Sequence, residues 1–363
     1  MKKVKKNIKN FIKQIDFKKV AIFVLALVIL SLPFAIEYFK SSQRIILKPS
    51  SAKQILFVLP DEKETPVLKE IEKAQKSIDL EMYLLSNKKI IQALKNAKKR
   101  GVEIKIILEK NPYNLEWFNK KIFKELKEIG MQTKWSNPEF SLTHSKFMII
   151  DDQVVIIMTC NFTYSGFNAS RDFGLINFDS NDVAEIKKLF EADWQNESFV
   201  SSRQDLVISP INSRSKLESI IKNAKSEILI AGEIMNDQRI QDFLSKARKR
   251  GVEVKILLAD IKDSEINQEA GKYFQARNMQ VKYLKKPFLH AKIIIVDNEI
   301  LYLGSINFSS SSMDENRELG ILLANPIRKE MGSQPSRGVG LSNGVNKNLI
   351  QQVREIFERD WGN

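Results

Sequence analysis

The chain has 363 residues, of which 43% are hydrophobic and 28% charged, and this composition excludes an intrinsically disordered protein. The net charge of +14 would suit a nucleic acid or an anionic membrane, but residues 1–40 hold nine lysines against two acidic residues, so +7 of it is local. A single cysteine, Cys160, excludes an internal disulfide and a cysteine-rich zinc site, and we interpret it as a small buried side chain.

The N-terminal residues predict a membrane anchor. Residues 1–19 form a basic segment with eight lysines and one acidic residue, and residues 20–36 follow without any charge. Such an apolar run lies at the lower limit for a membrane-spanning helix, and the lysines before it are expected to stay in the cytoplasm. We therefore expect a transmembrane signal anchor at 20–36, a connector at 37–50 and a catalytic part outside the cytoplasm. Secretion after cleavage of a signal peptide is the alternative.

Residues 51–198 alternate strands and helices, as is typical of an α/β domain. Gly101 closes one helix and a β-branched run follows it, which indicates a helix C-cap and then a buried strand. This order predicts a mixed, mostly parallel sheet flanked by helices. Tyr113, Trp117 and Phe118 lie at helical spacing, which favours a place in the core, with contact to a nucleic acid as the alternative. The expected strands are Gln54–Leu59, Ser77–Tyr83, Val102–Leu108 and Gln132–Trp135, and the expected helices are Thr65–Lys76, Lys88–Arg100, Leu115–Ile129 and Val183–Trp194.

Residues 199–363 repeat this pattern as a second domain. The helix end, glycine and strand of residues 97–108 return at 247–258, and the ending Phe-Glu-x-Asp-Trp occurs at 190–194 and 357–361. Two domain-sized copies indicate a tandem duplication rather than a solenoid.

Two further segments belong to the second copy. A strand at 206–210 is expected to open it. Residues 326–348 are rich in Gly, Ser and Asn, and they predict a mobile surface loop, with a lid over the site as the alternative.

One stretch of the second domain has the residues expected of a reactive site. His290 and Lys292 lie two residues apart at the start of an apolar β-branched run, so a strand directs both side chains to one face. Asp297 follows after four intervening residues, and Gly304-Ser305-x-Asn307 follows after six more.

The first domain carries the same pattern. His144, Lys146 and Asp151 have the same spacing, and Thr159 and Asn161 come after them. Met158 and Thr159 stand where the second copy has Gly and Ser. The chain contains only these two histidines, and two unrelated structural histidines would not share their neighbours. The repetition predicts a paired catalytic site.

These residue types suit a phosphate group. An imidazole can attack or protonate, while a neighbouring ammonium neutralises phosphoryl oxygens and the amides of Asn161 and Asn307 can donate to them. Asp172 lies 28 residues after His144, and Glu318 lies 28 residues after His290. A carboxylate that accepts one ring N–H fixes the tautomer of a histidine.

The paired stretches resemble the phospholipase D superfamily, whose signature is HxKxxxxDxxxxxxGSxN. The second copy matches in full, the first departs at Met158 and Thr159, and the resemblance covers residues 50 to 363. It implies two tandem α/β repeats related by a pseudo-twofold axis, with both motifs meeting in one site. It also implies metal-independent transfer through a phosphohistidine, without a cofactor.

The resemblance also implies a role for each residue. His144 would be the nucleophile and His290 the general acid and base, with Asp172 and Glu318 orienting the rings. Asp151 and Asp297 complete the catalytic motif, where we expect them to act more as structural anchors. The phosphoryl oxygens would be held by Lys146, Lys292, Asn161, Asn307, Ser305 and Thr159.

Three functions are compatible with this pattern. The first is a membrane-tethered phospholipase D-like hydrolase or transferase of phospholipids, favoured by the anchor. The second is a nuclease acting on single-stranded DNA or RNA, and the third is a non-catalytic binder of anionic ligands, suggested by Met158 and Thr159. Because both motifs lie in one chain, no oligomer is required to complete the site.

Overall fold

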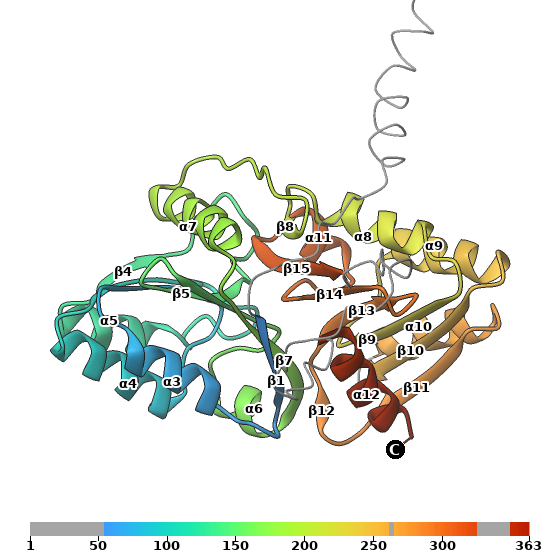
Figure 1. The fold of residues 1–363 in the computed structure, drawn as a ribbon, viewed down its shortest axis with the longest axis horizontal. Coiled ribbons are helices and arrows are strands. Elements are labelled where there is room, and N and C mark those ends of the chain that lie inside the picture. Colours follow the sequence, from blue (N-terminus) through green and yellow to red (C-terminus); the bar gives the residue numbers. More distant parts are fainter. Residues whose placement is uncertain (1–53, 261–264, 325–348, 363) are drawn as a thin grey trace, which may run out of the picture. The chain divides into compact units, whose positions relative to one another are not determined.

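The computed structural model describes residues 54–260, 265–324 and 349–362, all within one compact unit, Ile45–Asn363 (Figure 1). The predicted basic segment, anchor and connector lie outside the described residues, and so does the predicted loop at 326–348. None of the helices in the described ranges has both the length and the hydrophobicity needed to cross a bilayer.

The first half forms a sheet with the strand order β1-β7-β6-β5-β2-β3-β4. Its strands are rich in Ile, Val, Leu and Phe, and most of their side chains are buried. The strands are β1 (Gln54–Leu59), β2 (Ser77–Met82), β3 (Glu103–Leu108), β4 (Gln132–Trp135), β5 (Lys146–Ile150), β6 (Val154–Met158) and β7 (Ser170–Asn177).

The second half repeats this sheet with the strand order β11-β10-β9-β13-β14-β15-β8. One short strand, β12 (Phe288–Leu289), belongs to the second half in sequence but pairs with β7 of the first. The other strands are β8 (Leu206–Ser209), β9 (Glu227–Gly232), β10 (Glu253–Ala259), β11 (Gln280–Leu284), β13 (Lys292–Val296), β14 (Ile300–Gly304) and β15 (Glu318–Ala324).

The expectation of two tandem α/β repeats with mixed sheets is confirmed. The parallel part is smaller than the helix–glycine–strand pattern indicated. Among the described strands, the parallel pairs are β2–β3 and β3–β4 in the first sheet, β9–β10 and β10–β11 in the second, and the short β12–β7 pair. The other pairs are antiparallel, including β2–β5 and β9–β13. The motif strands β5 and β13 are followed by tight turns, so they pair antiparallel with β6 and β14.

Helices cover both sheets, and the core has three parts. One cluster of buried side chains takes residues from both halves, among them Phe147, Phe190, Ile293 and Phe357, and it lies between the sheets. Two further clusters belong to one half each. The helices are α3 (Thr65–Lys73), α4 (Lys88–Lys99), α5 (Lys120–Glu128), α6 (Tyr164–Asn168), α7 (Ser180–Gln195), α8 (Ser213–Lys222), α9 (Gln238–Lys249), α10 (Glu265–Gln275), α11 (Ser310–Asp314) and α12 (Leu349–Gly362).

The helix predicted from Leu115 begins only at Lys120. The buried Asn119 donates from its side chain to the backbone carbonyls of Tyr83 and Glu109, at 2.7 and 2.8 Å, and these bonds fix the chain before the helix starts. As a result Tyr113 and Trp117 are 74% and 68% exposed, and their interpretation as core residues was wrong.

Candidate active site

Both motif histidines lie at equivalent strand edges, and each is held by the backbone of the other half. His144 precedes β5, and its N–H donates to the carbonyl of Arg317 at 2.8 Å. His290 precedes β13, and its N–H donates to the carbonyl of Arg171 at 3.1 Å. The two halves therefore meet through reciprocal backbone contacts at the histidines.

The predicted carboxylates contact the histidines in a crossed arrangement. Glu318 of the second half lies 2.9 Å from Nδ1 of His144, and Asp172 of the first half lies 3.0 Å from Nδ1 of His290. Both carboxylates are fully buried, whereas the two histidine side chains are 12% and 16% exposed. A carboxylate at Nδ1 favours the tautomer that carries its proton there, which leaves Nε2 of His144 as the ring nitrogen for chemistry.

Burial affects the charge of His144 and Lys146. Loss of solvation lowers the pKa of His144 to about 4, with the neighbouring Lys146 adding to this and Glu318 opposing it. Lys292 of the other half also lowers the pKa of His144, so both halves act on one site. Burial likewise lowers the pKa of Lys146 to about 7. Its ammonium donates to the carbonyl of His144 at 2.7 Å.

One position breaks the symmetry between the halves, and the sequence analysis missed it. Tyr83 directly follows β2 and Glu233 directly follows β9, so the two occupy equivalent places. The Tyr83 ring lies edge-on to His144, with 4.5 Å between ring centroids, and 5.2 Å from the Lys146 ammonium. The sequence could have indicated this pair only by position, because each residue directly follows a strand that pairs with a motif strand.

Glu233 gives the second half-site an extra negative charge. Its carboxylate lies 2.6 Å from the Lys292 ammonium and 3.5 Å from Nε2 of His290. Burial alone would raise the pKa of Glu233, but His290 and Lys292 outweigh that effect and lower it to about 2. The second half-site thus combines a histidine, a lysine and two carboxylates, whereas the first has one carboxylate and a phenol ring.

The hydroxyls of Thr159 and Ser305 lie behind the site rather than facing it. Thr159 donates to Asp172 at 2.5 Å and accepts from the N–H of Phe173 at 2.9 Å. Ser305 donates to the carbonyl of Leu319 at 3.3 Å. Both side chains are fully buried, so the geometry favours a supporting role over the predicted contact with phosphate.

The departure of the first motif from Gly-Ser has a steric explanation. A Cβ atom on Gly304 would stand 2.4 Å from the Cα of Gly320, so the second half needs glycine there. In the first half Met158 fills the equivalent place within the core beside Cys160. Cys160 is fully buried, as predicted, and burial raises the pKa of its thiol well above the usual value.

The two asparagines retain unused polar atoms. The side-chain oxygens of Asn161 and Asn307 are buried and have no hydrogen-bond partner within the described part of the chain. Buried polar atoms without a partner are uncommon in folded proteins. As acceptors these oxygens suit a hydroxyl or water of a ligand, and only the amide N–H groups could bind phosphoryl oxygens.

Asp151 and Asp297 lie at the far end of the motif strands. The five residues of β5 or β13, about 17 Å of extended chain, separate each of them from the histidine edge. Asp297 accepts from the backbone N–H groups of Lys225, Ser226 and Glu227, and Asp151 makes the matching bonds. This distance argues against direct contact of Asp151 and Asp297 with a phosphate, and the geometry supports the anchoring role that we expected of them.

The repeated Phe-Glu-x-Asp-Trp ending supplies a second pair of crossed contacts. Asp360 of α12 binds the side chain of Arg171 at 2.6 Å, and Asp193 of α7 binds that of Arg317 at 3.0 Å. Both arginines are buried and precede the carboxylates Asp172 and Glu318 in sequence. Each ending thus fixes the strand of the other half that carries Asp172 or Glu318.

Comparisons with known proteins agree with this arrangement. A family model described as "Cardiolipin synthase, PLD-like domain" matches residues 67–194 and 217–361. A cardiolipin synthase of Clostridium perfringens (strain 13) is 26% identical over 81% of this chain and 73% of its own length. Cardiolipin synthase B of Salmonella typhi is 24% identical over 71% and 73%. The chain spans 66%, or just under two thirds, of another C. perfringens cardiolipin synthase.

Two solved structures share the fold. The phosphatidylserine synthase of Haemophilus influenzae superposes with a TM-score of 0.61 at 13% identity, covering 85% of both chains. The polyphosphate kinase of Porphyromonas gingivalis superposes with a TM-score of 0.61 at 17% identity, covering 77% of this chain and 48% of that one.

Proposed function

The chain belongs to the phospholipase D superfamily, and we propose that it is a phosphatidyltransferase that moves a phosphatidyl group from one phospholipid to a hydroxyl of another. The motif residues alone leave hydrolysis and transfer equally open. The names of the relatives favour a synthase over the hydrolase that the sequence pattern predicted. We also propose that it acts at a membrane, where the predicted anchor at 20–36 would hold it.

The crossed histidine–carboxylate pairs are the observation that carries this proposal. Each reactive ring needs a carboxylate from the opposite half, so the two motifs form one site with two unlike halves. A nucleophile must be neutral, and the low pKa of His144 keeps it so at pH 7. This supports His144 as nucleophile and His290 as general acid and base.

In the first step, Nε2 of His144 attacks phosphorus while the bond from phosphorus to the leaving alcohol oxygen breaks. His290 gives that oxygen its proton, which releases the first alcohol and leaves a phosphohistidine. Lys146, Lys292 and the two asparagine amides would hold the non-bridging oxygens. Glu318 stabilises the ring of His144 as it gains positive charge.

In the second step, an acceptor hydroxyl gives its proton to His290 and its oxygen attacks phosphorus. The bond from phosphorus to Nε2 of His144 breaks, and a new phosphodiester leaves. Water in place of the acceptor would give phosphatidic acid, so the choice between transfer and hydrolysis depends on what reaches His290. The Glu233 carboxylate, 3.5 Å from Nε2 of His290, can stabilise the protonated ring that donates in the first step and forms again in the second.

The full chain in mixed micelles of phosphatidylglycerol, with EDTA present, tests this function. Cardiolipin and free glycerol as products would support transfer, whereas phosphatidic acid and glycerol would mean hydrolysis. A labelled single-stranded oligonucleotide is incubated in parallel. Cleavage of the oligonucleotide with intact lipid would overturn the proposal in favour of a nuclease.

Two variants control for the mechanism. His144→Ala and His290→Ala should each lower the rate of product formation at least a thousand-fold, because each removes a group that forms or breaks a bond. Full activity of either variant would refute the paired-histidine mechanism. A strict requirement for an added divalent metal would refute its metal-independent form.

A further inference from the structure

Several loops of the first half leave the sheet at the edge that carries His144. The register places Met82 opposite both Leu108 and Lys146, and it places Phe147 opposite Ile157. The ends of β2, β3 and β6 and the start of β5 therefore share one edge. The segments 109–119 and 159–169 emerge there, next to the nucleophile.

Segment 109–119 is tied directly to the site. The N–H of Tyr113 donates to the hydroxyl of Tyr83 at 2.7 Å, and the Tyr83 ring contacts His144. Glu109, at the base of the segment, accepts from the N–H of Thr143 at 2.6 Å. These bonds hold the segment at a fixed position beside His144.

The outer side of this edge exposes aromatic rings. Tyr113, Trp117 and Tyr164 are 74%, 68% and 74% exposed, which is unusual for side chains of this size. Tyr164 begins α6, and the equivalent first residue of α11 in the second half is Ser310. The comparison between the halves shows that the fold does not require an aromatic residue there.

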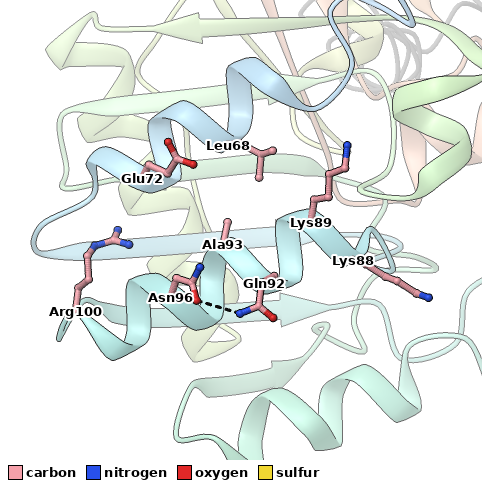
Figure 2. A pocket seen from close by; sticks show the side chains of 8 residues that line it. All are labelled: Leu68, Glu72, Lys88, Lys89, Gln92, Ala93, Asn96 and Arg100. Atoms are coloured by element: carbon pink, nitrogen blue, oxygen red, sulfur yellow. Dashed lines mark hydrogen bonds between the residues drawn. The ribbon is translucent and has the colours of Figure 1, made fainter.

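Basic residues accompany the rings. Lys110, Lys120 and Lys121 are exposed on the same segment or at the start of α5, with Glu116 as an acidic exception. Lys88 starts α4 after the neighbouring loop, and Figure 2 shows it projecting from the groove between α3 and α4. A cavity of about 450 Å³ beside this groove is lined by Lys88 and Tyr164, and its wall also contains the ion pair between Lys89 and Glu64.

We propose that the surface formed by Tyr113, Trp117, Tyr164 and these lysines docks on an anionic phospholipid bilayer. Tyrosine and tryptophan rings favour the membrane–water interface because one end is apolar and the other polar, and lysines are attracted to anionic headgroups. The docked surface would hold His144 beside the headgroups. This inference rests on the proposed action on phospholipids.

Tryptophan fluorescence tests the docking independently of catalysis. The full chain is reconstituted in vesicles of phosphatidylglycerol mixed with phosphatidylcholine brominated in the upper acyl chain. The bromines should quench the emission of Trp117, and Trp117→Phe should remove the quenched component. Trp361→Phe, in the second half, is the matched control and should leave the quenching unchanged. Equal quenching of wild type and Trp117→Phe would overturn the proposal.

Activity provides the second readout. In the reconstituted full chain, Trp117→Ser should lower the turnover of vesicle phospholipid about ten-fold, and Lys120→Gln about five-fold. Tyr164→Ser, which copies the second half, should behave like Trp117→Ser. None of the three should change the rate with a short-chain phospholipid below its micellar concentration.

A loss of rate on the soluble substrate equal to that on vesicles would overturn docking. Absence of all lipid turnover with intact Trp117 quenching would overturn only the proposed function. Quenching of Trp117 by an oligonucleotide but not by lipid would assign the surface to nucleic acid and overturn docking.

Discussion

Replacing Glu318 by Gln should slow the formation of the phosphohistidine and little else. The glutamine keeps the size and the acceptor oxygen of the buried carboxylate that lies 2.9 Å from Nδ1 of His144, but it removes the charge. A hydrogen bond to a charged group contributes about 1.5–3 kcal/mol and a neutral one about 0.5–1.5 kcal/mol. The difference, about 1–2 kcal/mol, corresponds to a rate lowered about 5- to 30-fold.

The step can be isolated with a phosphatidyl ester of a chromogenic phenol. A phenolate leaves without a proton, so the initial burst of colour reports the attack by His144 and not the action of His290. Asp172→Asn is the matched control, because it changes the carboxylate of the other histidine. It should leave the burst nearly unchanged and slow the later turnover.

Two results would refute this reasoning. A burst slowed by Asp172→Asn and unaffected by Glu318→Gln would show that the roles of the histidines are reversed. Equal slowing by both variants would show that the two carboxylates do not serve separate steps. Thermal melting of both variants checks that the fold is retained.

Three other predictions follow from the contacts described above. Asp297→Ala leaves three backbone N–H groups without their acceptor and should lower stability by about 2 kcal/mol, seen as a melting temperature lower by about 3 °C with kcat retained. Backbone hydrogen bonds outweigh burial and lower the pKa of Asp297. The stability that the Asp297 carboxylate adds to the wild type should therefore be lost only as the pH falls below about 4, and the stability difference from Asp297→Ala should shrink there. Because burial lowers the pKa of Lys146 to about 7, its positive charge is lost above that pH, and KM for a phosphodiester should rise there; Lys146→Arg should remove this dependence. Gly304→Ala should lower the melting temperature by several degrees, because its methyl group would meet the Gly320 backbone; an unchanged melting curve would contradict this.

Much of the fold was predictable because the apolar runs are regular and the chain repeats itself. The predicted ends of β1 agree with the structure, since its apolar run is followed by the turn residues Pro60 and Asp61. The predicted ends of β4 also agree, although its sequence is mostly polar. The start of α5 was not predictable, because one buried side chain, Asn119, bonds to two distant carbonyls and overrides the helical pattern.

The site residues were named from spacing, but their partners were not. A separation of 28 residues from each histidine to its carboxylate is identical in both copies, so it cannot show which ring each carboxylate contacts. The His290–Asp172 contact comes from β12 pairing with β7, between residues 118 positions apart, and the His144–Glu318 contact comes from the β-bridge between Thr143 and Arg317. Glu233 was missed because its counterpart, Tyr83, is not a carboxylate, so no repeated letter marked the position.

The crossed carboxylates make the effects of sequence changes in the two copies interdependent. A substitution near Glu318 alters the histidine of the first half, and one near Asp172 alters that of the second. A half expressed by itself would contain one histidine and one carboxylate, and each would lack its partner from the other half. Met158 and Glu233 mark positions at which the two copies differ while both crossed pairs are kept.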